Sequence, residues 1–328
     1  MRAHASDAID SMKRFLLRRL LLAFLTLWLL TGVVFFASHA LPGNVAQKVL
    51  GPFADPEGVK QLNHELGTDR PIPQQYVTWI AKTVRLDFGR SLNYNRPVTE
   101  KLRPALGYSA RLALFAFVLV VPISIAGGII AAMKRGRFLD RFITVAGLSA
   151  AVVPEFVWGV LLVLVFGVKL HWLPVPGLAP PGSSVFSQYK HLLMPALCLV
   201  FVLFGYIARI TRAGVIEAMD ADYTRTAALK GLTSGEVVVR HVLRNALVPT
   251  IAVVATQLGY LLGGLIAVEY LFNYPGLGQL LLNAVKKRDF PLLQAAVLVS
   301  GTVYVVATFA ADLLYMVLNP RLRQGATS

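Results

Sequence analysis

Residues 112–133 read LALFAFVLVVPISIAGGIIAAM, and this stretch decides the fold class because it contains no charged side chain. As an α-helix it would be about 33 Å long, enough to cross the roughly 30 Å hydrocarbon core of a bilayer. Comparable apolar windows occupy residues 20–38, 142–168, 192–208, 245–268 and 290–318. The windows show no period-two alternation and are too long for membrane strands. They predict an all-α polytopic membrane protein with six transmembrane helices.

The composition excludes an ordinary soluble protein. Of 328 residues, 56% are hydrophobic and 15% are charged, whereas soluble domains carry about 25% charged residues. Only Glu155 and Asp312 place a charge inside the six windows. The single cysteine, Cys198, excludes an intrachain disulfide and any zinc site built on cysteines.

The net charge of +15 is explained by topology without a nucleic-acid partner. One set of short loops carries 17 Lys and Arg, and the alternate set carries 5. Positive charge is retained on the cytoplasmic side. We therefore expect cytoplasmic termini at 1–19 and 319–328, a cytoplasmic loop at 209–248, and an extracytoplasmic subdomain at 39–111. The apolar run at 20–38 is longer than a signal-peptide core, which predicts that this helix is retained. Separately, Met12 would also make a natural start of the chain.

The loop at 209–248 contains residues that favour the start and the end of short helices. Asp222 is a candidate N-cap for a short helix that starts at Tyr223, and Lys230 suits the C-terminal end of that helix. Gly231 then offers a left-handed C-terminal position. Residues 233–236, TSGE, form a capping box that would open a second helix through residues 237–243. The pattern predicts a helix–turn–helix outside the membrane; a solvated connector is the plainer alternative.

Two segments of this loop resemble a known family. Residues 223–232, YTRTAALKGL, and 240–249, RHVLRNALVP, resemble the EAA loop of ATP-binding-cassette (ABC) importer permeases of the dipeptide/oligopeptide/nickel family. Arg225 and Thr226 depart from the general EAA pattern in the way that this subfamily does. Short matches recur along the chain at 41–44, 66–71, 86–91, 172–174, 274–278 and 319–321. Their order resembles the B-type permease, with its long loop after the first span.

The resemblance implies the fold of a type I ABC importer permease in a bacterial or archaeal cytoplasmic membrane. The implied partners are a second homologous permease, two ABC ATPases, an extracytoplasmic solute-binding protein and the lipid bilayer. The chain has no phosphate-binding Gly-rich motif, so we expect it to bind no cofactor, with ATP and Mg²⁺ used by the ATPases. Di- or oligopeptides are the expected solutes, with nickel, glutathione or an oligosaccharide as alternatives. A stand-alone channel or secondary carrier is disfavoured because no internal repeat is visible.

The resemblance assigns ATPase coupling to one group of residues: Asp222, Tyr223, Arg225, Thr226, Ala227, Lys230, Gly231 and Leu232. The translocation path is predicted at Glu155, Gly259 and Gly263, and binding-protein docking at Tyr274, Pro275 and Gly276. Close helix packing is the default interpretation of the two glycines, with the path as the sharper alternative. For Glu155, a structural hydrogen bond at the Pro154 break is an equally good interpretation. Glu269 is expected to anchor the 274–278 turn. Asp312 is expected to form a structural ion pair near Arg321 and Arg323.

Overall fold

The computed structural model describes residues 2–40, 45–51 and 53–318. Every regular element in these ranges is a helix, which confirms the predicted all-α class. The elements are α1 (Arg2–Ala40), α2 (Val45–Leu50), α3 (Pro56–Leu66), α4 (Ile72–Val84), α5 (Val98–Met133), α6 (Phe138–Val152), α7 (Glu155–Leu162), the π-helix η1 (Val163–Lys169), α8 (Val185–Asp220), α9 (Asp222–Leu229), α10 (Ser234–Val237), the π-helix η2 (Val238–Val242), α11 (Leu243–Leu271), α12 (Leu277–Lys286) and α13 (Phe290–Leu318).

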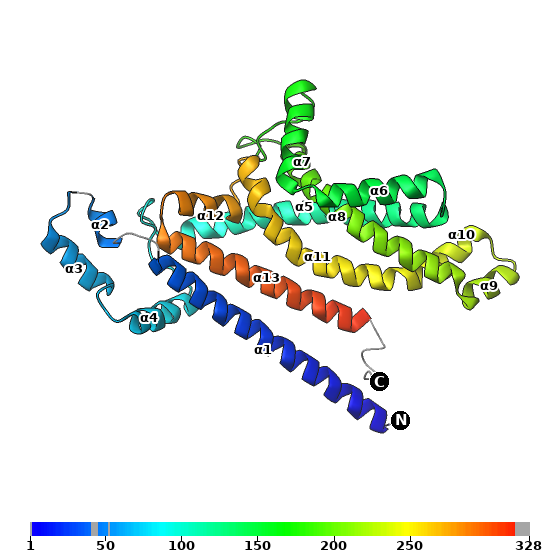
Figure 1. Ribbon diagram of the computed structural model, residues 1–328, viewed down its shortest axis with the longest axis horizontal. Helices are drawn as coiled ribbons and strands as arrows, with labels where there is room; N and C mark the ends of the chain where they lie inside the picture. Colours follow the sequence, from blue (N-terminus) through cyan, green and yellow to red (C-terminus); the bar gives the residue numbers. More distant parts are fainter. Residues whose placement is uncertain (1, 41–44, 52, 319–328) are drawn as a thin grey trace.

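The long helices run roughly along one axis of the molecule (Figure 1). Four segments among the described residues are long and apolar enough to span a membrane, namely 16–39, α5, α8 and 290–314. The bent pair of α6 with α7 and η1 is a fifth candidate. α11 contains the remaining predicted window at 245–268 but is not one of these candidates. The multi-pass membrane class is therefore confirmed, whereas the predicted count of six spans is not.

The predicted window at 142–168 is not one straight helix. The chain bends by 104° between α6 and the helical segment of α7 and η1. Val153 is extended, with φ −78° and ψ 125°, because a residue before proline is disfavoured in the helical region. Pro154 also lacks the N–H that a continuing helix would need. The indole Nε1 of Trp158 donates a hydrogen bond across the break to the carbonyl of Ala150, 3.0 Å away.

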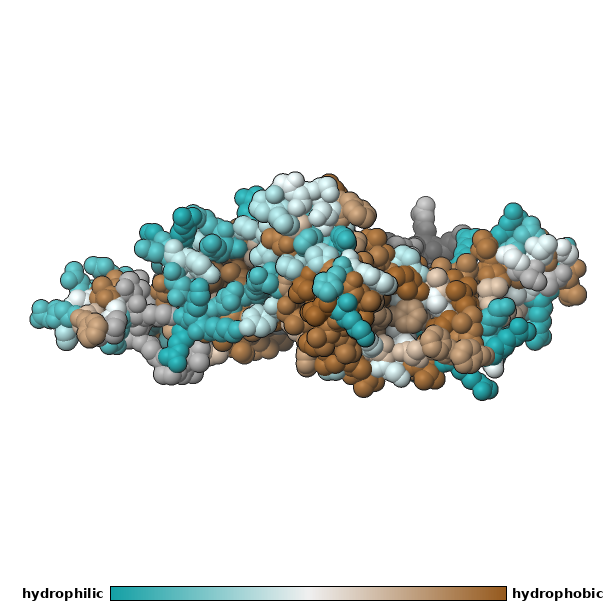
Figure 2. All heavy atoms as spheres, turned by 90° about the horizontal axis from the view of Figure 1, so that it is seen from above, coloured by the Kyte–Doolittle hydropathy of each residue, from teal (hydrophilic) through white to brown (hydrophobic). Residues whose placement is uncertain are grey.

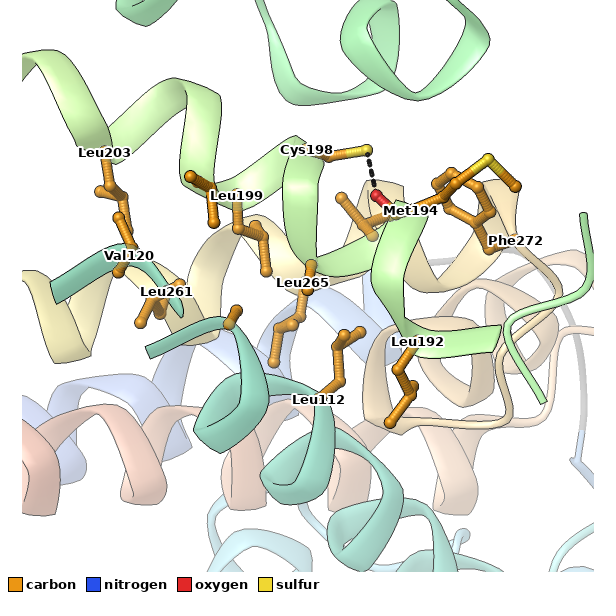
Figure 3. Close-up of a cluster of buried hydrophobic side chains, with 14 of the residues drawn as sticks. Leu112, Val120, Leu192, Met194, Cys198, Leu199, Leu203, Leu261, Leu265 and Phe272 are labelled. Carbon is orange, nitrogen blue, oxygen red and sulfur yellow. Dashed lines mark hydrogen bonds between the residues drawn. The ribbon is translucent and has the colours of Figure 1, made fainter. Parts of the chain in front are cut away.

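α8 is the central helix of the bundle. In its most apolar stretch 67% of the residues are buried, against 11% for α1. Figure 3 shows side chains of α5, α8 and α11 meeting in one hydrophobic cluster, with Val120, Leu203 and Leu261 close together. A helix that is buried on most sides contacts several neighbouring helices. The position of α8 therefore constrains the positions of those helices and of the segments that follow it in the chain.

Two glycines allow α6 to approach α8 closely. A Cβ atom added to Gly205 would collide with the backbone of Gly147, and one added to Gly147 would lie 3.0 Å from the Cα of Gly205. Small residues that face each other let helix backbones come together where lipid offers no hydrophobic driving force. The position of α6 along α8 therefore depends on both glycines.

The outer surface of the bundle is apolar. Large hydrophobic side chains are exposed on several helices, for example Phe24 of α1, Leu114 of α5 and Phe142 of α6. Figure 2 shows hydrophobic residues concentrated over the middle of the long axis and hydrophilic residues toward its ends. An apolar band of this kind is the expected contact surface for lipid.

The predicted subdomain at 39–111 comprises α2, α3, α4 and the first turns of α5. α2, α3 and α4 lie at the opposite end of the molecule from α9 and α10 (Figure 1). α4 is attached to α1 by aromatic side chains: the rings of Phe35 and Tyr76 lie 5.2 Å apart, and the Tyr76 hydroxyl is 2.8 Å from that of Thr31.

Candidate coupling helix and external turn

α9 follows α8 after a single linking residue. Ala221 is extended, with φ −74° and ψ 149°, and its carbonyl accepts a hydrogen bond from the N–H of Thr224. The predicted N-cap at Asp222 is therefore wrong by one residue. Ala221 occupies the N-cap because its carbonyl begins the helix, and Asp222 lies in the first turn, where a negative charge still favours the helix dipole. The Thr224 hydroxyl also donates to the carbonyl of Ala218, 2.6 Å away, which fixes α9 to the end of α8.

One face of α9 is buried against the rest of the loop. Ala227 is 5% exposed and belongs to a hydrophobic cluster with Val215 and Ala218 of α8, Val237 of α10 and Val242 of η2. Leu232 packs against the same cluster. The short helix is therefore held by tertiary packing, which an isolated helix of eight residues would need in order to persist.

The other face of α9 is open. Six residues predicted for coupling are exposed: Asp222, Tyr223, Arg225, Thr226, Lys230 and Gly231. Leu229 is also exposed, at 88%. Leu229 lies within the motif at 223–232 but is not among the residues predicted for coupling. A residue two positions after Ala227 falls on a different face of a helix. Because Ala227 is buried, the apolar side chain of Leu229 lies on the exposed side.

The turn after α9 follows the predicted chemistry. Gly231 has φ +85°, in the left-handed region that favours glycine. In the capping box, the backbone N–H of Thr233 donates to Glu236 Oε2 at 3.0 Å, and the N–H of Glu236 donates to Thr233 Oγ1 at 3.4 Å. The bond from Thr233 holds the pKa of the exposed Glu236 carboxyl below its usual value. The predicted second helix is the continuous run of α10, η2 and α11, with Pro249 inside α11 rather than at its start.

An ion pair that the sequence did not reveal braces α8 near this region. Arg212 donates from Nε and Nη2 to the two carboxylate oxygens of Asp140, at 2.6 and 2.8 Å. The N–H of Gly136 donates to the same carboxylate at 2.8 Å. Asp140 is only 4% exposed. The two-pronged contact ties the turn before α6 to the part of α8 that carries α9.

At the other end of the molecule, Glu269 organises the turn between α11 and α12. Its carboxylate accepts hydrogen bonds from the Ser109 hydroxyl of α5 at 2.5 Å and from the N–H of Gly278 at 2.7 Å. The Ser109 oxygen in turn accepts from the N–H of Leu277, 2.8 Å away. The side chain of Glu269 is fully buried. The structure thus confirms that Glu269 anchors the turn.

The residues predicted for docking are part of this anchored turn. Tyr274 is 1% exposed, and its hydroxyl donates to the carbonyl of Tyr108 at 3.1 Å. Gly276 is also buried, and Pro275 is half-buried. Tyr274 and Gly276 are buried in this chain because the aromatic ring fills the space between α5 and the turn, and the docking role of the three residues stays a prediction. Sequence alone could not separate an exposed loop from one folded into the bundle.

The three residues predicted to line the translocation path differ from one another in their surroundings. Glu155 is half-buried in the first turn of α7. A Cβ added to Gly259 would lie 3.0 Å from the Tyr304 ring, so this glycine supports close packing of α11 on α13. Gly263 is in α11, at a position whose surroundings lie outside those that the structure describes.

Asp312 forms an ion pair, as predicted, but with another partner. Its carboxylate lies 3.0 Å from Nη2 of Arg19 in α1. The two arginines expected nearby, Arg321 and Arg323, fall outside the described residues. The pair links α1 to α13, a contact between distant parts of the chain that spacing within the last span could not indicate.

The helices and these sites define a class: a multi-pass α-helical membrane protein with an organised short helix at one end of its bundle. Residues 124–324 match the family described as binding-protein-dependent transport system inner membrane component, and residues 12–119 match the N-terminal family of such membrane components. The chain belongs to this family and is a permease subunit of an ABC importer, a transport protein and not an enzyme.

Curated relatives give the same assignment. The chain is 36% identical over 312 residues to the glutathione transport system permease protein GsiC of Escherichia coli K12, and equally to that of Shigella dysenteriae serotype 1 (strain Sd197). Each match covers 95% of this chain and 99% of the relative. The family places the protein in the inner membrane, and importers of this kind work with ATPase and binding-protein partners.

Proposed function

We propose that this chain forms half of the translocation pathway for a small peptide-like solute and transmits ATP-driven movement through residues 222–249. The single observation that carries the proposal is the construction of α9. Ala227 and Thr224 fix one face to the loop and to α8, while Tyr223 and Leu229 of α9, and Lys230 directly after it, remain exposed. A short helix held in this way can receive a push from a partner and pass it to a long helix.

α8 is the structural link between that helix and the bundle. It runs without interruption from Val185 to Asp220, so that α9 is attached to the most deeply buried helix. The ion pair of Asp140 with Arg212 would resist bending where α8 leaves the apolar windows. Displacement of α9 would then shift α8 as a rigid body, together with the α6, α5 and α11 contacts around it.

The arrangement of the ends supports the proposed orientation. The start of α1 and the end of α13 lie toward the same end of the long axis as α9 and α10 (Figure 1). Since short loops near this end carry most of the positive charge, we place both termini and α9 in the cytoplasm. The subdomain of α2, α3 and α4 would then be extracytoplasmic.

The proposed assembly comprises this chain, a second homologous permease, two ABC ATPases and an extracytoplasmic solute-binding protein. We expect this chain to bind no cofactor, with ATP and Mg²⁺ bound by the ATPases. The substrate class rests on the relatives named for glutathione transport and on the resemblance to peptide permeases. Glutathione is itself peptide-like, so it stands with dipeptides and oligopeptides, and nickel or an oligosaccharide remain alternatives within the family.

Reconstitution of the complete system in proteoliposomes tests the proposal. Labelled dipeptide and labelled glutathione should accumulate only when ATP and the binding protein are both present, and omission of either should abolish uptake. Competition by unlabelled peptide, glutathione or Ni²⁺ would rank the solutes. Uptake of equal rate without ATPase subunits would instead establish a channel or secondary carrier and reject the importer mechanism.

A further inference from the structure

α4 has an apolar side that the described part of the chain leaves uncovered. All 13 residues of this helix are described, and none is buried. Val77 and Val84 are 66% and 77% exposed. They lie seven positions apart, so their side chains project within about 20° of each other around the helix. Thr78 and Lys82 are polar, exposed and on another side of the helix. We call the side formed by Val77 and Val84 the valine face.

α4 is attached to the rest of the chain mainly through two aromatic side chains. The rings of Tyr76 and Trp79 lie 5.2 and 5.5 Å from the ring of Phe35 in α1, and Phe35 is only 2% exposed. Figure 1 shows α4 beside the end of α1 that is remote from the N-terminus. A helix of 13 residues is marginal in water on its own. The valine face is therefore expected to have a partner beyond this chain.

The contacts with α1 fix the level of α4 relative to the membrane. Thr31, whose hydroxyl is 2.8 Å from that of Tyr76, and Phe35 both lie inside the apolar segment 16–39 that can span a membrane. Thr31 precedes His39, the end of this segment, by eight residues, or about 12 Å along the helix. An interfacial helix buries its apolar side about 5–10 Å into the boundary between headgroups and acyl chains. The contacts thus place α4 at the level of this boundary.

The valine face also continues an apolar surface that already faces lipid. Only 11% of the most apolar stretch of α1 is buried, and its Val33 and Phe36 are 65% and 55% exposed. The ring of Phe36 stacks on that of Tyr76, with centroids 6.1 Å apart. Tyrosine and tryptophan are enriched at the membrane–water interface. A lipid surface therefore fits this side of α4, while Thr78 and Lys82 would face headgroups and water.

We propose that the valine face of α4 lies in the phospholipid bilayer and that α4 is an interfacial helix. In the orientation proposed above, it occupies the outer leaflet; the proposed function enters only through this assignment of the leaflet. α4 would then hold the outer end of α1 at a fixed depth through Phe35 and Thr31. The predicted extracytoplasmic subdomain would project into water through α2 and α3 but not through α4.

The test measures the surroundings of the valine face in the complete transporter, in nanodiscs of phosphatidylcholine and phosphatidylglycerol. A nitroxide spin label on Val77→Cys should collide several-fold more often with O₂, which concentrates among acyl chains, than with water-soluble chromium oxalate. Val84→Cys should behave in the same way. Thr78→Cys is the matched control, next to Val77 but on the polar side, and should show the opposite preference. The labelled wild type gives the background, since Cys198 is buried.

Frequent collisions of the label at Val77→Cys with chromium oxalate would overturn the proposal, because the face would then lie in water. Few collisions with either reagent would also overturn it, because protein, such as the second permease, would then cover the face. Addition of the solute-binding protein should leave the O₂ collisions unchanged, and a fall would identify that protein as the partner instead. The measurement needs neither ATP nor solute, so a failure of import would reject the proposed function without altering this result.

Discussion

Leu229→Ser removes the most exposed large apolar side chain of α9. The side chain is 88% exposed in this chain, so an ATPase groove around α9 could bury almost all of it. Burial of a leucine side chain contributes about 1.5–3 kcal/mol. Its loss should therefore weaken association with the ATPase subunits by about ten- to 150-fold. Folding should be little affected, because substitutions at exposed sites usually change stability by less than about 0.5 kcal/mol.

The assay measures the affinity of purified ATPase subunits for the permease pair in nanodiscs, and uptake in proteoliposomes made from the same proteins. Val239→Ser is the matched control, since Val239 is an apolar residue of the same loop, 66% exposed, in η2 rather than α9. We expect Leu229→Ser to lose both association and uptake, and Val239→Ser to retain them. Equal affinity of Leu229→Ser and wild type would refute the assignment of α9 as the ATPase contact.

Three further substitutions test the supports of this helix and of the external turn. Arg212→Leu leaves the buried Asp140 carboxylate without its cation and should cost about 3–5 kcal/mol, seen as a lower melting temperature. Glu269→Ala removes the acceptor for buried donors of the turn and should cost about 1–3 kcal/mol, measured in the same way. Gly205→Leu would force α8 away from Gly147 of α6, and we expect a sharp fall in the yield of folded protein in the membrane.

Compensating and conservative substitutions distinguish the loss of these specific contacts from a general loss of stability. Adding Asp140→Asn to Arg212→Leu removes the unpaired charge and should restore part of the lost stability. Glu269→Gln keeps an acceptor oxygen and should melt closer to the wild type than Glu269→Ala. A melting temperature unchanged by Arg212→Leu would show that the ion pair does not brace α8.

Sequence predicted the parts of this fold that depend on local chemistry. Apolar length predicts membrane helices because the bilayer sets a minimum length for a helix that spans it. Gly231 predicts a left-handed residue after the short helix, and the structure shows it at φ +85°. The capping box at Thr233 and Glu236 forms as its spacing predicts. In each case the residues that decide the structure belong to one continuous segment of the chain.

The features that sequence missed depend on which distant segments meet. Asp140 and Arg212 are 72 positions apart, and the burial of Tyr274 depends on contact with Tyr108 of α5. A break at Pro154 follows from the sequence, but its angle of 104° is set by how α7 packs against α8 and α11. Tertiary contacts of this kind leave no periodic signal in one chain.

The most direct test of the coupling mechanism compares two glycines of the same loop. Gly231 and Gly235 both have open space where a Cβ would lie, but only Gly231 has a positive φ. Valine at Gly231 should therefore distort the turn after α9, whereas valine at Gly235 should not. ATP-dependent uptake in proteoliposomes should be lost in Gly231→Val and retained in Gly235→Val, with equal amounts of both proteins in the membrane. Normal uptake by Gly231→Val would contradict the claim that the fixed angle of α9 transmits the movement.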